Sequence, residues 1–156
     1  MNPEVYRVKL ADEVQKPDYQ PHDGMTFCNF FVREVARWFD CTDFDDEGDW
    51  EKMASDYLDI MKKGGNWVEV GSEIGASAAQ AGRLVVAGAS APEGEKHAHV
   101  VIVAPEKMSY SGSWDALVPA VANVGRTVFY GQRISMAFKA AQKKDVGYYL
   151  YGGQSV

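Results

Sequence analysis

The sequence predicts an α+β domain in which N-terminal helices pack on a central antiparallel β-sheet. In Thr26–Phe39, apolar residues recur every three or four positions, which is the period of one helix face. Two later stretches, Leu84–Gly88 and His99–Val103, are continuous apolar runs rich in valine, as is typical of strands buried on both faces. Helices that precede a run of strands, instead of alternating with them, indicate the α+β class.

The chain has 156 residues, a length that suits one domain spanning 1–156. Its first 24 residues contain three prolines and Gly24 among polar residues, so we expect an extended lead-in over 1–24, with a short strand at Val5–Leu10. No internal repeat or linker divides the rest.

Composition excludes several classes of function. Hydrophobic content of 46% and charged content of 24% indicate a soluble globular protein. The net charge of -6 disfavours binding to nucleic acid or to an anionic membrane, since both would repel the chain. No apolar run approaches the ~20 residues of a membrane span, so we expect no membrane insertion. The first residues lack the features of a secretory signal, so we expect synthesis in the cytoplasm without a signal peptide.

The first predicted helix, Thr26–Phe39, carries the main candidate for chemistry. Thr26 is a good N-cap, which places Cys28 in the first turn, and Asn29 lies on the predicted solvent face. The free N–H groups and the helix dipole at this end favour a thiolate, the nucleophilic form of cysteine. A lone cysteine is more often a small buried apolar residue, so the position alone leaves both interpretations open.

The other cysteine and the acidic residues give little support for a disulfide or a metal. Cys41 follows the helix that Cys28 begins, so the two would lie ~20 Å apart, beyond disulfide reach. The acidic loop Asp43–Asp49 partly matches a calcium-binding loop, but Ala54 stands where the bidentate glutamate belongs. We therefore expect a solvated loop, and neither a metal nor a cofactor.

The remaining elements follow from periodicity and capping residues. We expect helices at Trp50–Lys63, at Ser72–Ala81 with Ser72 as the cap, and at Ile134–Ala141. Further strands are expected at Trp67–Val70, Leu117–Val121, Thr127–Tyr130 and Val146–Tyr151.

His99 is the candidate partner of Cys28. It immediately precedes the buried run Val100–Val103, so it stands at the end of a central strand, where a side chain is held firmly yet can be reached. A cysteine and a histidine far apart in sequence but at element ends fit a nucleophile and its base. His97 would point to the same face but lies nearer a polar loop, and His22 is explained by a surface position.

Five segments in chain order carry a resemblance to a known family. They are Thr26-Phe27-Cys28-Asn29-Phe30-Phe31-Val32, Gly65-Asn66-Trp67-Val68-Glu69-Val70, Ala81-Gly82-Arg83-Leu84-Val85-Val86-Ala87, Ala98-His99-Val100-Val101-Ile102-Val103 and Val118-Pro119-Ala120-Val121-Ala122-Asn123-Val124-Gly125. Together they resemble the NlpC/P60 and CHAP amidases, cysteine peptidases of papain-like fold that cut peptidoglycan peptides. The similarity is greatest to the branch found in phage lysins and type VI secretion amidase effectors.

The resemblance implies a papain-like NlpC/P60 fold, with Cys28 as nucleophile and His99 as base. It also implies an amidase or endopeptidase that hydrolyses an amide bond in bacterial peptidoglycan peptides, acting in the periplasm or cell wall after non-classical export or phage lysis. For a secreted effector, a dedicated immunity protein would be the partner.

A third polar residue should hydrogen-bond the far imidazole nitrogen and fix the reactive tautomer. The candidates are Asn123, Asp115 and Ser111, and we favour Asn123 because it lies in a segment that carries the resemblance. The backbone N–H of Cys28 is the expected oxyanion donor. Trp50, Trp67, Trp114 and Tyr110 are candidates for the groove lining.

Two other functions are open on the sequence alone. The same fold could run acyl transfer, as a transglutaminase or transpeptidase does, with an amine as acceptor in place of water. Alternatively, the chain could be a non-catalytic wall-binding module in which Cys28 is structural.

Overall fold

The computed structural model describes residues 1–152, and within them the chain is α+β, as predicted. A six-stranded sheet has the order β1-β8-β2-β3-β6-β7, and all its neighbouring strands pair antiparallel. Its strands are β1 (Trp67–Val70), β2 (Val85–Ala89), β3 (His99–Val103), β6 (Ala120–Asn123), β7 (Phe129–Arg133) and β8 (Gly147–Tyr151). A separate hairpin consists of β4 (Ser109–Ser111) and β5 (Ala116–Val118).

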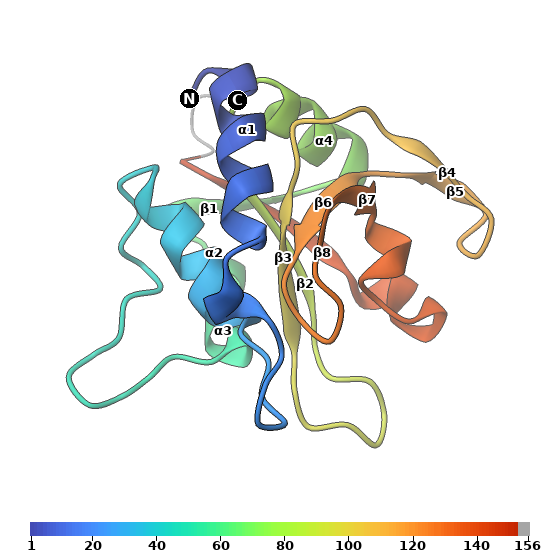
Figure 1. Cartoon of the computed structure of the whole chain (residues 1–156). Coiled ribbons are helices and arrows are strands. Elements are labelled where there is room, and N and C mark those ends of the chain that lie inside the picture. The colour runs from blue at the N-terminus through green and yellow to red at the C-terminus, as the bar shows by residue number, and fades with distance from the viewer. Residues whose placement is uncertain (153–156) are drawn as a thin grey trace.

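Helices cover both faces of the large sheet (Figure 1). One face packs against α1 (Pro3–Val14), α2 (Cys28–Arg37) and α3 (Ala54–Lys63). The other face packs against α4 (Ser72–Gln80) and the 3-10 helix η2 (Ile134–Met136), and a second 3-10 helix, η3 (Ala140–Asp145), precedes β8. The sheet has a hydrophobic core on each face, and alternate residues of β3 point into one or the other. Val100 and Ile102 face α2, whereas Val101 and Val103 face away from it. The prediction that His99–Val103 is buried on both faces is therefore confirmed from Val100 onward.

The prediction of an extended lead-in over residues 1–24, with a strand at Val5–Leu10, is wrong. Residues Pro3–Val14 form α1, and η1 (Pro17–Tyr19) follows. The Asn2 side chain caps α1 by accepting from the N–H groups of Glu4 and Val5, and Pro3 stands at a position where helices tolerate proline. Tyr6 and Leu10, one turn apart, are fully buried against the sheet-facing core.

Helix α2 starts and ends close to the prediction, with two corrections. Phe27, and not Thr26, is the N-cap residue, so Cys28 is the first residue of the helix. Asn29 is buried instead of exposed, because its side chain donates to the Lys52 carbonyl at 3.1 Å. The segment before α3 therefore covers the predicted solvent face at this point.

Other predicted elements are confirmed with shifted bounds. The strands at Trp67–Val70 and His99–Val103 are confirmed to the residue, and those at Leu84–Gly88, Thr127–Tyr130 and Val146–Tyr151 are present as β2, β7 and β8. The helix expected at Trp50–Lys63 begins only at Ala54, and Gly71 is the N-cap residue of α4 in place of Ser72.

Two predictions from the C-terminal half need correction. The strand expected over Leu117–Val121 is two strands, β5 and β6, which belong to different sheets. Pro119 separates them and has no N–H to give to a ladder. The helix expected at Ile134–Ala141 is replaced by two 3-10 segments, η2 and η3.

The acidic loop is held by the chain's own cations. Arg37 pairs with Asp45 and Arg33 with Asp46, each at 2.9 Å. The Lys52 ammonium group donates to the Asp45 carbonyl at 2.8 Å. Within residues 1–152, no three histidine, cysteine or acidic side chains are grouped as metal ligands. In the same range, no helix has both the length and the apolar character needed to cross a membrane.

Candidate active site

The residues predicted to carry chemistry lie at one end of the sheet. Cys28 is the first residue of α2, His99 the first of β3 and Asn123 the last of β6. All three line one cavity of about 540 Å³. A second cavity, of about 310 Å³, also reaches Cys28, and both cavities are lined by Thr26, Lys96, His97 and Ala98. We call the larger one the His99 arm and the smaller one the Met53 arm, and together they form a cleft across Cys28.

Cys28 lies between helix and sheet, and its side chain is 8% exposed. Burial raises the pKa of the thiol above its ordinary value, while backbone groups of Val100, Asn29 and Cys28 itself lower it by less. The N–H groups at the helix start therefore lower the pKa of the thiol, as predicted, but desolvation outweighs them and the net shift is upward. A nucleophile at this position needs a base that takes its proton.

His99 has the features of such a base. Its Nε2 lies 2.6 Å from Oδ1 of Asn123, and Nδ2 of Asn123 donates to the Thr127 carbonyl at 2.8 Å. The second hydrogen bond sets the amide so that Oδ1, which can only accept, faces the imidazole. Nε2 therefore carries the proton, which leaves Nδ1 as the nitrogen that can accept one.

The His99 ring is fixed on two further sides. A Cβ placed on Gly125 would come within 3.1 Å of Cε1 of His99, so the glycine backbone lies directly against the ring. The Phe138 ring lies on His99 with a centroid separation of 5.2 Å. Burial lowers the pKa of the imidazole, and the hydrogen bond with Asn123 raises it by less. Burial thus shifts both groups toward their neutral forms, the thiol of Cys28 and the unprotonated imidazole of His99.

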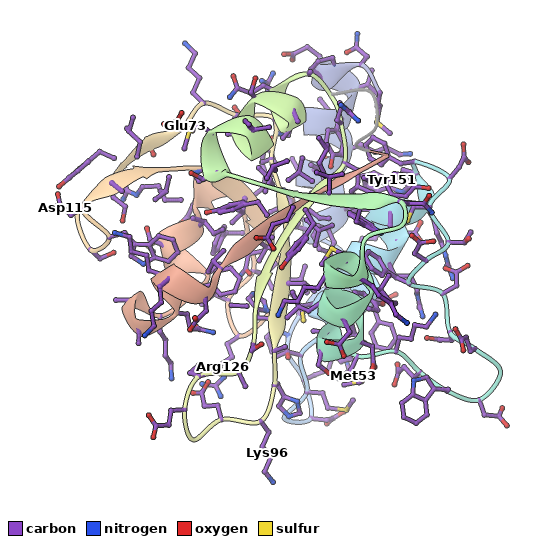
Figure 2. The ribbon with its side chains drawn as sticks, turned by 180° about the vertical axis from the view of Figure 1, so that it is seen from behind. Met53, Glu73, Lys96, Asp115, Arg126 and Tyr151 are labelled. Carbon is purple, nitrogen blue, oxygen red and sulfur yellow. The ribbon has the colours of Figure 1, made fainter. Side chains whose placement is uncertain are left out.

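The alternative third residues lie elsewhere. Asp115 accepts a hydrogen bond from the exposed Tyr110 at 2.5 Å, in the turn of the β4–β5 hairpin. Figure 2 places Asp115 far from Arg126, which follows Asn123 by three residues. Ser111 donates to Ser135 at 2.8 Å. Of the three candidates, only Asn123 bonds to His99.

The structure also places the two other histidines and the aromatic candidates. His97 is exposed and lines both arms of the cleft, and His22 lies against the Phe27 ring with its Nδ1 3.3 Å from Asp23. None of Trp50, Trp67, Trp114 and Tyr110 lines either arm. Trp67 and Trp114 are buried in the two cores, and the other two are exposed.

Several lining residues were not identified from the sequence. Arg126, Phe138 and Lys139 line the His99 arm, and Met25 and Met53 line the Met53 arm. Most stand in loops, where no periodicity marks an inward face. The sequence offered one indication for Arg126: it lies in the short segment Asn123–Thr127, so it must be close to Asn123.

Comparisons with known proteins give no independent assignment. No protein-family model and no curated protein matched the chain. The chemistry of the cleft therefore has to be argued from its own residues.

Proposed function

We propose that the chain is a papain-like cysteine amidase or endopeptidase of NlpC/P60 type, which hydrolyses an amide bond in bacterial peptidoglycan peptides. The observation that carries the proposal is the shared cavity of Cys28, at a helix N-terminus, and His99, whose Nε2 is held by Asn123 at 2.6 Å. A nucleophile, a base and an orienting acceptor from three separate elements form the arrangement that acyl chemistry needs. The choice of peptidoglycan as substrate rests on the sequence resemblance.

The residues support a two-step reaction. The Cys28 thiol gives its proton to Nδ1 of His99 as Sγ attacks the amide carbonyl, and a tetrahedral intermediate with a negatively charged oxygen forms. The N–H of Cys28 has no partner within α2, because it is the first residue of the helix, and it can donate to the developing oxyanion. His99 then delivers the proton to the leaving amine, the C–N bond breaks and a thioester remains. His99 next takes a proton from the water that attacks the thioester and returns it to Sγ as the carboxylic acid is released.

Digestion of purified peptidoglycan is the test of this function. The wild-type chain should release peptides with a new amine and a new carboxyl end, which mass spectrometry identifies. In ¹⁸O-labelled water the new carboxyl should carry the label. If an added amine is joined to the acyl product as an amide, with no ¹⁸O incorporated, the reaction is acyl transfer instead. Alkylation of Cys28 that depends on His99 shows that the site is active. If peptidoglycan stays intact with such a protein, it is not the substrate.

The setting of this activity is part of the proposal. Peptidoglycan lies outside the cytoplasm, so the enzyme would act in the periplasm or cell wall, and an immunity protein would have to cover the cleft in a cell that exports it. Expression directed to the periplasm of a sensitive bacterium should cause lysis that Cys28→Ala prevents. Absence of lysis with active enzyme present would contradict the antibacterial role and favour a housekeeping one.

Asn123→Ala should reduce turnover and shift its pH dependence. Loss of the acceptor frees the imidazole to rotate, and we expect kcat to fall by about 10- to 100-fold, part of what a general acid–base residue contributes. Because the Asn123 hydrogen bond raises the pKa of His99, its removal should move the acid limb of the kcat/KM profile to lower pH. Asn66→Ala, at an exposed position outside the cleft, is the control. An acid limb that stays in place would show that Asn123 does not act through His99.

Gly125→Ala should lower activity without unfolding the protein. The added Cβ would lie 3.1 Å from Cε1 of His99, so the ring must move by a few tenths of an ångström. Misplacement of a catalytic group by 1 Å can cost 10²-fold, and the smaller shift here should cost about tenfold in kcat. Gly112→Ala is the matched control, since no atom lies within 4 Å of the position that its new Cβ would take. Equal kcat values for both variants would mean that the ring tolerates the displacement.

A further inference from the structure

Positive charge gathers in the His99 arm of a chain whose net charge is -6. Lys96, Arg126 and Lys139 line this arm, and Glu95 is its acidic residue. Figure 2 shows Lys96 and Arg126 at the same end of the molecule. The Met53 arm shares Lys96, and no other lysine, arginine or acidic residue lines it. The charge is therefore concentrated on the His99 side of Cys28.

Internal pairing leaves part of this charge free. The Lys139 ammonium group lies 2.5 Å from the Glu95 carboxylate, and this contact, with a weaker contribution from the charge of Arg126, holds the pKa of Glu95 below its ordinary value. Lys139 and Glu95 thus neutralise each other. Within residues 1–152, neither Lys96 nor Arg126 has a carboxylate partner.

Arg126 differs in this respect from the other arginines. Arg7, Arg33 and Arg37 form ion pairs, and Arg83 and Arg133 donate to backbone carbonyls. Among the described residues, Arg126 is the arginine whose guanidinium group makes neither contact. Its planar fork of donors matches a carboxylate, which it can bind through two parallel hydrogen bonds.

The position of Arg126 relates this free charge to the reaction. It stands in the turn that joins Asn123, the acceptor for His99, to Thr127, whose carbonyl holds the Asn123 amide. A Cβ on its neighbour Gly125 would lie only 3.1 Å from Cε1 of His99. In the proposed reaction His99 protonates the leaving amine, so that amine must lie on the His99 side of the sulfur. The part of the substrate nearest Arg126 is therefore the part that leaves.

We propose that Arg126, with Lys96 in the lining of the same arm, binds a carboxylate on the portion of the substrate that supplies the leaving amine. This inference rests on the proposed function and specifies its substrate: an amide whose amine component is an amino acid or peptide with a free carboxylate near the bond. Amides whose amine component has no free carboxylate near the bond should be poor substrates.

The test uses two peptides synthesised around the bond that the peptidoglycan digestion identifies. They differ only in whether the leaving residue carries a free carboxylate or a carboxamide. For the wild type we expect kcat/KM at least tenfold higher on the carboxylate form. The preference should fall below twofold in Arg126→Gln and be partly kept in Arg126→Lys. Lys62→Gln removes a charge outside the cleft and should keep the full preference. A wild type without preference, or Arg126→Gln with the wild-type preference, would overturn the proposal.

A binding measurement separates failure of this inference from failure of the proposed function. Calorimetry with the Cys28→Ala variant and a disaccharide tetrapeptide muropeptide needs no turnover. We expect Kd to rise at least tenfold when Arg126 is also changed to Gln, or when the carboxylates of the muropeptide are converted to carboxamides. If no bond in peptidoglycan is cut, the proposed function fails. The calorimetry then decides by itself whether Arg126 binds a carboxylate. Equal Kd values for the two variants and the two ligands would overturn it.

Discussion

Replacing Cys28 with alanine or serine should abolish amide hydrolysis. Alanine removes the nucleophile, and a serine hydroxyl at this position is far less acidic than the thiol that His99 must deprotonate. We expect kcat to fall by at least about 10⁴-fold, in the range measured for loss of a catalytic nucleophile. Cys28 is buried, but either substitution removes or replaces only its sulfur atom, so the free energy of unfolding should change by only about 1 kcal/mol. Turnover assays and thermal melts measure the two effects separately.

The second cysteine provides a matched control. Cys41 is also a free thiol and is buried, but it lies outside the cleft, and Tyr151 and the backbone at Asp43 are its polar neighbours. Cys41→Ser should keep activity within about twofold, as expected for a change far from the reacting atoms. Hydrolysis that survives in Cys28→Ala but stops in a folded Cys41→Ser protein would show that the nucleophile has been misassigned.

Replacing His99 with alanine should lower kcat by at least a few hundredfold, within the usual range for loss of a general acid–base. The variant removes both the acceptor of the Cys28 proton and the donor to the leaving amine. In the wild type, activity should fall as the pH drops through the pKa of His99, because a protonated imidazole cannot take the proton. Since burial lowers this pKa, the acid limb should lie below the ordinary value for histidine. That limb should be absent from the residual activity of the variant.

His97 is the control for this prediction, because it lines the same cleft. It is exposed, and within the described residues no hydrogen bond fixes its ring, so it is a poor candidate for a positioned base. His97→Ala should cost less than about tenfold in kcat and keep the acid limb. If the acid limb survives in His99→Ala and disappears in His97→Ala, then His97 is the base and His99 is not.

The sequence predicted the parts of the fold in which local pattern and burial agree. The run Val100–Val103 is apolar without interruption because both faces of β3 are covered, and the strand begins at His99 as expected. The helix at Cys28 was equally clear from its apolar face. In residues 1–24 the three prolines indicate an extended chain, whereas the Asn2 cap and the spacing of Tyr6 and Leu10 favour the helix that the structure has as α1.

The candidate site was predictable to a similar degree. Cys28 and His99 stand at element ends, which sequence patterns locate well, and both line the cleft. Asn123 could be chosen over Asp115 and Ser111 only through the resemblance, and it is the one hydrogen-bonded to His99. Arg126 and Phe138 lie in loops, so their approach to His99 depends on tertiary packing, which periodicity does not encode. The effect of the helix start on the pKa of Cys28 was predictable in direction, whereas the larger, opposite effect of burial depends on the strand that covers the residue.

The central claim is that Cys28 and His99 act together as nucleophile and base. The most direct measurement is the rate of iodoacetamide modification at Cys28, followed by peptide mass spectrometry as a function of pH. The account predicts modification at Cys28 well before Cys41, with a rate that at neutral pH falls at least tenfold in His99→Ala, in keeping with loss of a general base. A Cys28 as inert as Cys41, or one modified at the same rate with and without His99, would contradict it.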